Sequence, residues 1–279
     1  MPLTTTADLV TRAAAARRAV AAFNIITLEH VEAVVEGAES LGSPVVLQVS
    51  ENAVAFRRGD VRPLARAALA VAEQAAVPVA LHLDHVRDDT LLKQAADAGF
   101  SSVMYDASHL PYGENLAATR AAVGWAHGEG LWIEAELGEI GGKRGAHAPG
   151  VRTDPDEART FVADSGVDAL AVAVGSTHAM TSRTAVLDHA LLARLARAVD
   201  VPLVLHGSSG VPDGELTAAV VGGITKVNVG TALNLALTDA IRVHLAEHPH
   251  AVDSRAYLGA GREAMTRTAA RIIRVLSPP

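Results

Sequence analysis

The sequence contains no cysteine, and charged residues make up only 20% of its 279 positions. The absence of cysteine excludes disulfide bonds and thiolate ligands, so a bound metal ion would need histidine or carboxylate ligands. Hydrophobic residues account for 49% of the chain. This fraction supplies enough apolar surface for a large core, and no low-complexity segment predicts a disordered tail.

The sequence also lacks an excess of positive charge and a long apolar run. A net charge of −7 argues against a nucleic-acid partner or an anionic membrane surface. No stretch approaches the roughly 20 uninterrupted apolar residues of a membrane span. Arg12, Arg17 and Arg18 follow Asp8, and no apolar segment or cleavage motif comes after them, so we predict an ordinary opening helix. We therefore expect a cytoplasmic protein with no nucleic-acid or membrane partner.

Eight short apolar runs recur along the chain, separated by segments with helical spacing. The runs end at Ile25, Ser50, His85, Ser108, Gly138, Ser176, Gly210 and Thr231. The helical segments include residues 31–41, 61–75, 91–98, 116–128 and 187–199. This alternation indicates parallel strands covered by helices, and eight strands favour a closed (β/α)8 TIM barrel, with an open doubly wound sheet as the alternative. No linker divides the chain, so residues 1–279 are predicted to form one domain.

Polar residues gather where the apolar runs end, which in a barrel is the face that carries the active site. His85, His178 and His206 close the third, sixth and seventh runs. A single one of them would be interpreted as a buried, hydrogen-bonded histidine. Three at equivalent strand ends predict a shared site, and three imidazole nitrogens with an open position suit catalytic zinc. His82 lies inside the third run and is predicted to be a core or supporting histidine.

Three carboxylates accompany these histidines. Asp84 precedes His85 and, if it faces the cavity, is a candidate acid or base; its alternative role is to cap a loop. Asp106 and Glu136 close the fourth and fifth runs. They could provide an alternative metal position or accept hydrogen bonds from the histidines.

Turns rich in small residues end the last two runs. HGSSG spans residues 206–210, NVGT spans residues 228–231, and a helical segment follows each. Barrels often bind phosphate with the loops after strands seven and eight and a helix N-terminus. The two turns therefore predict a phosphate site, although such a turn by itself could be a simple connection.

Seven motifs, AFN, HLDH, DASH, EAELG, GVDALAVAVG, LHGSSG and KVNVGT, resemble in order and spacing those of the class II aldolases that split fructose or tagatose bisphosphate. The resemblance spans residues 20–275, and HLDH together with LHGSSG is its most specific part. It implies a zinc-dependent aldolase that reversibly cleaves a ketose 1,6-bisphosphate to dihydroxyacetone phosphate and an aldehyde. In such an enzyme zinc polarises the ketone and stabilises the enediolate.

The resemblance also implies roles for individual residues. His85, His178 and His206 would bind zinc, and Asp84 would transfer the proton of the hydroxyl at the cleaved bond. Asp106 and Glu136 are included in the predicted metal site. The residues expected to contact the substrate are Asn24, Ser50, Ala179, Arg183, Gly207, Ser208, Ser209, Asn228, Val229, Gly230 and Thr231. A nearby monovalent cation, Na⁺ or K⁺, and a homodimer or homotetramer complete the expectation.

The sequence departs from the family pattern at two places. Ala179 follows the second histidine, where the family usually has glycine, and Arg183 aligns with a basic residue of the relatives that could compensate. The loop after the fifth run reads Gly-Gly-Lys-Arg-Gly at residues 141–145, without the glutamate that helps to move the substrate proton. Lys143 and Arg144 could meet an anionic substrate instead, and Glu139 is the nearest carboxylate.

The sequence is also compatible with other functions. The nearest is an aldolase acting on a phospho-keto-deoxy sugar acid, and residues near Ser50 and in the C-terminal segment would decide between the substrates. Arg255 and Arg262 could bind a distal phosphate or be exposed helix charges. A metal-dependent hydrolase is disfavoured because the first strand ends in Phe-Asn-Ile instead of carrying His-x-His. A non-catalytic sugar-phosphate binder is disfavoured by the presence of Asp84.

Overall fold

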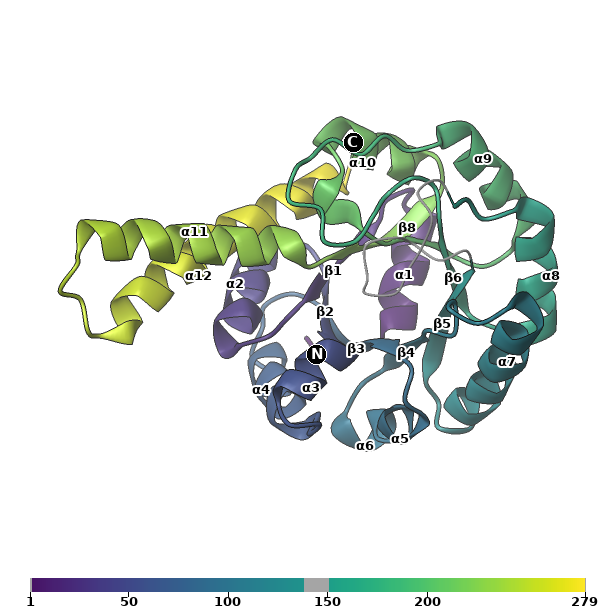
Figure 1. Ribbon diagram of the computed structural model, residues 1–279, viewed down its shortest axis with the longest axis horizontal. Coiled ribbons are helices and arrows are strands. Elements are labelled where there is room, and N and C mark those ends of the chain that lie inside the picture. Colours follow the sequence, from purple (N-terminus) through teal and green to yellow (C-terminus); the bar gives the residue numbers. More distant parts are fainter. Residues whose placement is uncertain (1, 138–150, 279) are drawn as a thin grey trace.

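Eight parallel strands form a closed barrel in the computed structural model, which describes residues 2–137 and 151–278 (Figure 1). Each strand pairs with its neighbours in sequence, and β8 pairs with β1 to close the sheet. The strands are β1 (Val20–Asn24), β2 (Val45–Ser50), β3 (Val79–Val86), β4 (Ser102–Tyr105), β5 (Trp132–Leu137), β6 (Ala169–Val172), β7 (Leu203–Leu205) and β8 (Ile224–Val229). The predicted (β/α)8 barrel is therefore confirmed, and the open sheet is excluded.

Helices surround this barrel. They are α1 (Thr6–Ala15), α2 (Leu28–Glu39), α3 (Glu51–Phe56), α4 (Arg62–Ala72), α5 (Asp89–Leu92), α6 (Ala95–Ala98), α7 (Tyr112–Gly128), α8 (Pro155–Ser165), α9 (His189–Ala198), α10 (Asp213–Val221), α11 (Thr231–Glu247) and α12 (Ser254–Val275), with a 3-10 turn η1 (Ser208–Gly210) after β7. The limits of α8 follow from its sequence: the Asp154 side chain caps its first turn, and Gly166 ends it in the left-handed conformation. The helix expected over residues 91–98 is instead split into the single turns α5 and α6.

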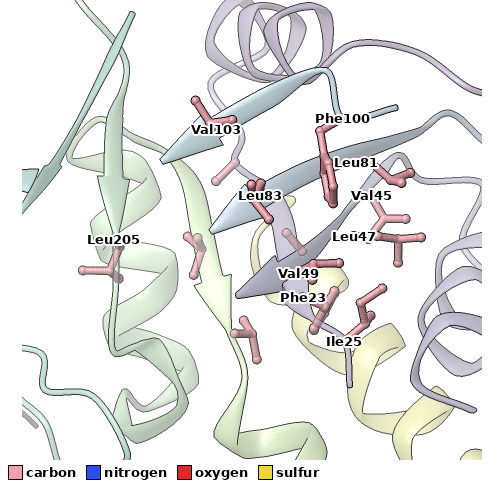
Figure 2. Packing of buried hydrophobic residues seen from close by; sticks show 14 of the residues in the cluster. Phe23, Ile25, Val45, Leu47, Val49, Leu81, Leu83, Phe100, Val103 and Leu205 are labelled. Atoms are coloured by element: carbon pink, nitrogen blue, oxygen red, sulfur yellow. The ribbon is translucent and has the colours of Figure 1, made fainter. Parts of the chain in front are cut away.

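Side chains on the outer face of the strands build the main core. Phe23, Leu47 and Leu81 are at most 1% exposed and pack in the layer between the strands and the surrounding helices (Figure 2). Because successive side chains of a strand point to opposite faces, the residues next to these along each strand point into the barrel. The outer layer therefore stabilises the fold and leaves the inner layer available for polar groups.

The interior of the barrel changes from apolar to polar along the strands. At the amino ends, α1 seals the barrel through an apolar cluster of Leu9, Val10, Val20, Ala22, Val46 and Ala80. Further along the strands lie polar side chains that are 0% exposed: Gln48, His82, Ser102, Glu134 and Lys226. This buried polar layer separates the sealed end from the carboxyl ends of the strands.

Helix α11 and the first part of α12 form an arm that projects away from the barrel (Figure 1). Leu233 is the buried residue of α11, a helix of 17 residues. The two helices approach closely at Gly261, where a Cβ atom would lie 2.4 Å from Leu237 Cδ1. The rest of α12 returns to the barrel and packs on α2. None of the helices within residues 2–137 and 151–278 has the length and apolar character needed to cross a bilayer.

Candidate active site

Three histidines meet at the carboxyl ends of the strands. His85 lies near the end of β3, His178 lies in the loop after β6, and His206 directly follows β7. One ring nitrogen from each lies within 4.8 Å of those from the other two, and the ring centroids are 4.8 to 5.7 Å apart. The structure therefore brings together the histidines that the sequence predicts to share a metal ion.

A bulge near the end of β3 turns two consecutive residues toward the same cavity. In a regular strand Asp84 and His85 would point to opposite faces of the sheet. The register with β4 shifts between Leu83 and Val86, and His85 has a left-handed φ of 54°. Both Asp84 and His85 consequently line the cavity described below.

Carboxylates hold two of the histidine rings. Asp106 Oδ2 lies 3.0 Å from His85 Nδ1, and Glu134 Oε1 lies 2.8 Å from His206 Nε2. The second ring nitrogen of buried His206, Nδ1, makes no hydrogen bond to any described residue and lies 3.2 Å from Glu136 Oε2. Carboxylates that accept from one imidazole nitrogen orient the other toward a metal ion. The donor set therefore fits zinc held by three imidazoles.

Negative charge is concentrated around the histidines. Asp84, Asp106, Glu134 and Glu136 are each at most 1% exposed. Burial lowers the pKa of the His206 imidazole, but its contacts with Glu134 and Glu136 outweigh this effect and raise the pKa to about 9. A proton on His206 therefore offsets part of this negative charge in the metal-free protein. A divalent cation bound by the histidines would offset it instead.

Asp84 is held between two side-chain amides. Asn24 Nδ2 donates to Asp84 Oδ2 at 2.7 Å, and Asn228 Nδ2 donates to Asp84 Oδ1 at 3.4 Å. His85 Nε2 lies 4.0 Å from the same carboxylate. Burial alone would raise the pKa of Asp84, but nearby His85 and His206 outweigh it and hold the pKa below its usual range. Asp84 is thus an ionised carboxylate that can accept a proton.

The histidines and Asp84 lie beside a cavity of about 600 Å³. The predicted site residues that line it are Asn24, Ser50, Asp84, His85, Asp106, His178, Ala179, Gly207, Ser208, Ser209, Asn228, Gly230 and Thr231. Its wall also contains Ile26, Glu51, Asn52, Arg87 and Asn234, which the sequence analysis did not assign to the site. Glu51 and Arg87 lie within two residues of Ser50 and His85, so their closeness to strand ends in the sequence could have identified them as site residues. Asn234 lies within α11, and nothing in the sequence around it indicates that it faces the cavity.

Four predicted site residues do not line the cavity that the described residues form. His206 and Glu136 are buried and contact each other. Val229 points to the outer face of the barrel and belongs to the main core. Arg183 donates to the Val211 carbonyl at 2.9 Å and pairs with Asp213. Its guanidinium therefore ties the loop after β6 to the segment after η1.

The two turns predicted to bind phosphate lie against each other. Ser208 Oγ donates to the Asn228 carbonyl, which joins the turn after β7 to the end of β8. Ser209 Oγ accepts a hydrogen bond from Ala232 N at 3.1 Å. Gly230 in the cavity wall directly precedes α11. The partial positive charge of a helix amino end favours an anion at this place.

Besides His85, two further positions in the wall, Gly207 and Ala179, have left-handed backbone conformations. Gly207 has a φ of 64°, and a Cβ atom there would lie 2.6 Å from the carbonyl carbon of Thr177. Glycine is therefore required for the close approach of the loops after β6 and β7. Ala179, where the family usually has glycine, retains the left-handed conformation with a φ of 58°.

The loop after β5 lies outside the described residues. It contains Glu139 and residues 141–145, including Lys143 and Arg144. The expectations about the missing loop glutamate and its replacement remain predictions.

The chain is similar to known proteins over nearly its whole length. The sequence profile of a family described as fructose-bisphosphate aldolase class-II matches residues 4–278. The chain is similar to the YdjI aldolase from Escherichia coli K12, with 30% identity, a TM-score of 0.85 and coverage of 98% of this chain and 97% of that one. A putative fructose-1,6-biphosphate aldolase from Coccidioides immitis is 31% identical, with a TM-score of 0.87 and coverage of 97% and 95%. The fructose-bisphosphate aldolase of Campylobacter jejuni, at 21% identity, a TM-score of 0.84 and coverage of 98% and 95%, shares the fold.

Proposed function

Because the chain belongs to the class II fructose-bisphosphate aldolase family and is an aldehyde-lyase, we propose that it cleaves a ketose 1,6-bisphosphate reversibly to dihydroxyacetone phosphate and an aldehyde, with zinc as cofactor. The observation that carries the proposal is the convergence of three histidines beside an ionised, amide-held Asp84 in one cavity. The Na⁺ or K⁺ ion rests on the resemblance alone. So does the homodimer or homotetramer.

His85, His178 and His206 would hold the zinc ion, with Asp106 and Glu134 fixing the rings of His85 and His206. Zinc bound there would act as a Lewis acid toward the ketone of the substrate. Asp84, ionised and beside the three histidines, would act as the base that removes the proton of the C4 hydroxyl. As that proton leaves, the C3–C4 bond breaks, the aldehyde forms, and the electron pair remains on the dihydroxyacetone phosphate fragment. A second group must then protonate C3 of that fragment.

The turns after β7 and β8 would hold the phosphate of that fragment, next to the amino end of α11. The opposite part of the wall, with Glu51, Asn52 and Arg87, would then meet the aldehyde half of the substrate. Arg87 Nη2 donates to Asp106 Oδ2 at 3.2 Å, so a cation lies within reach of that half. This placement is consistent with an aldehyde that carries an anionic group.

A test of the reaction uses the protein loaded with zinc, dihydroxyacetone phosphate and a panel of aldehydes that carry a phosphate, a carboxylate or no charge. We expect a carbon–carbon bond to form, phosphorylated aldehydes to react best, and chelation to stop the reaction. A parallel assay replaces dihydroxyacetone phosphate by pyruvate, and faster bond formation with pyruvate would favour a phospho-keto-deoxy sugar acid as the substrate. Full turnover by protein shown to be metal-free would contradict the proposal.

A further inference from the structure

Lys226 is a buried cation that the reaction scheme above leaves without a role. It lies on β8 with 0% of its surface exposed, in the polar layer inside the barrel. Removing an ammonium group from water costs several kcal/mol unless charged and polar partners compensate. A position inside the barrel beneath a catalytic cavity therefore requires specific partners.

Among the described residues Lys226 donates to two partners, and each leads to a different part of the site. Its Nζ donates to Glu134 Oε2 at 2.9 Å and to Asn228 Oδ1 at 2.7 Å. Glu134 uses its other oxygen, Oε1, to accept from His206 Nε2 at 2.8 Å. Asn228 uses its amide nitrogen to donate to Asp84 Oδ1 at 3.4 Å. One ammonium group thus lies one residue away from both the metal-site histidine and the catalytic carboxylate.

The chemistry of an ammonium group fixes the direction of both branches. Lys226 can only donate, so the oxygen of the Asn228 amide must face it, and the amide nitrogen must face Asp84. A carboxylate paired with an ammonium group can only accept, so His206 must present an N–H at Nε2 to Glu134. Nδ1 of His206, which lies 3.2 Å from Glu136 Oε2, is then the nitrogen left to bind a metal ion once its own proton has been displaced.

We propose that Lys226 is a positioning residue that aims His206 at the metal ion through Glu134 and aims the Asn228 amide at Asp84. The inference rests on the proposed function for the roles of the metal ion and Asp84. The hydrogen bond between His206 and Glu134, in contrast, is a property of the metal-free chain. It can be tested even if the substrate is different.

The structure supplies a matched control on the other side of Asp84. Gln48 Nε2 donates to Asn24 Oδ1 at 3.3 Å, and Asn24 donates to Asp84. Gln48 is as buried as Lys226, but among the described hydrogen bonds it reaches Asp84 through Asn24 alone and makes no direct hydrogen bond to Glu134. Gln48→Leu therefore perturbs only the carboxylate, whereas Lys226→Met perturbs both the carboxylate and the metal ligand.

The experiment compares Lys226→Met and Gln48→Leu in zinc affinity, by competition with a chelator, and in kcat and KM at saturating zinc. We expect Lys226→Met to bind zinc 10- to 100-fold more weakly, the usual effect of losing support for a metal ligand, and to lose kcat even when zinc is saturating. Gln48→Leu should bind zinc normally and lose kcat only. A merely structural role would lower the melting temperature of both variants without separating their zinc affinities.

A readout without metal completes the test. The metal-free protein should show a downfield imidazole N–H resonance by NMR, which is assigned to His206 by its absence in His206→Gln. This resonance should disappear in Lys226→Met and persist in Gln48→Leu. If Lys226→Met fails to fold, the pair Lys226→Met with Glu134→Gln removes the unpaired buried charge and should restore folding but not zinc affinity. Normal zinc affinity and an unchanged N–H resonance in a folded Lys226 variant would overturn the inference. If Lys226→Met loses both while the wild-type protein shows no zinc-dependent cleavage, the proposed function is refuted and the positioning of His206 by Lys226 is retained.

Discussion

At the scale of single residues, replacement of Asp84 should separate the steps of the proposed reaction. Asp84→Asn removes the proton acceptor, and its amide would also face the donating amides of Asn24 and Asn228. We expect cleavage to fall by about 10² to 10⁴-fold, the usual contribution of a general base. Zinc content should persist, because the three histidines are untouched. Assays of cleavage, zinc content and hydrogen exchange at C3 of dihydroxyacetone phosphate check this.

Exchange at C3 gives the control for that variant. Some exchange should survive in Asp84→Asn, since protonation of C3 requires a different group. Normal cleavage combined with lost exchange would show that the role assigned to Asp84 is wrong. Slow exchange in the wild type, accelerated by Arg144→Glu, would be the consequence of the glutamate missing from residues 141–145.

Zinc binding should release a proton from His206. Burial lowers the pKa of His206, but Glu134 and Glu136 outweigh it and raise the pKa to about 9. At pH 7.5 the metal-free His206 is therefore protonated, and zinc must displace that proton. The apparent zinc affinity should fall about tenfold for each unit that the pH is lowered from 9 toward 7. Calorimetry in two buffers of different ionisation enthalpy should show about one proton released at pH 7.5. Zinc binding without proton release would show that His206 is not protonated in the metal-free protein.

The same shift has the opposite sign for the stability of the metal-free protein. The pKa of His206 is raised from 6.5 in the folded state, so the folded protein binds this proton more tightly than the unfolded chain. The resulting stabilisation is complete below pH 6.5 and is lost as the pH rises toward 9. Unfolding free energies of metal-free wild type and His206→Ala should therefore converge at high pH.

The convergence of residues at strand ends could be predicted from the sequence. His85, His178 and Asp84 could be found because parallel strands end on one face, so polar residues distant in sequence converge there. The buried layer of Glu134 and Lys226 was missed as a unit, because its partners depend on how strands are arranged around the barrel. A period of two was nevertheless visible in Glu-Ala-Glu at residues 134–136 and Lys-Val-Asn at residues 226–228.

At the scale of elements, the turn after β7 depends on one glycine. Gly207→Val would introduce a β-branched side chain at a φ of 64°, against backbone atoms of Thr177. We expect KM for dihydroxyacetone phosphate to rise more than zinc content falls. Gly214→Ala is the control, because a Cβ atom at Gly214 meets nothing within 4 Å. An unchanged KM in Gly207→Val would show that the phosphate binds elsewhere.

Two helix glycines should respond to the same substitution with opposite signs. Gly37 of α2 faces α12, where a Cβ atom would lie 2.9 Å from the Thr266 carbonyl oxygen and 3.0 Å from Ala269 Cβ. Gly124 of α7 has nothing within 4 Å. Chemical denaturation should show Gly37→Ala destabilised by about 1 to 3 kcal/mol and Gly124→Ala stabilised by up to about 1 kcal/mol. Equal effects would mean that α2 and α12 are not closely packed.

Strands and most helices could be predicted because their patterns are local. The split between α5 and α6 was missed because residues 91–98 retain helical spacing across the break. The arm was missed for a different reason. Helix α11 has a helical pattern whether its apolar side chains meet the barrel or another helix, and only tertiary packing decides this. At Gly261 the partner of α11 is α12.

At the scale of the whole molecule, the barrel is sealed at one end and functional at the other. The apolar cluster of α1, with Leu9 and Val10, closes the amino ends of the strands, and the cavity lies at the carboxyl ends. Alternating apolar runs predicted this architecture from the sequence. The expected homodimer or homotetramer concerns surfaces that a single chain does not test, so it stays a prediction.

The three histidines lie in separate segments, on β3, in the loop after β6 and directly after β7, so a bound ion would act as a reversible crosslink across residues 85–206. The unfolded chain has no such arrangement, and by mass action the ion would stabilise the folded state. Free zinc at about one hundred times its dissociation constant corresponds to about 2.7 kcal/mol. The melting temperature should therefore rise with zinc concentration in the wild type and stay constant in His206→Ala. The concentration of free zinc would then determine the melting temperature of the protein as well as its catalytic rate.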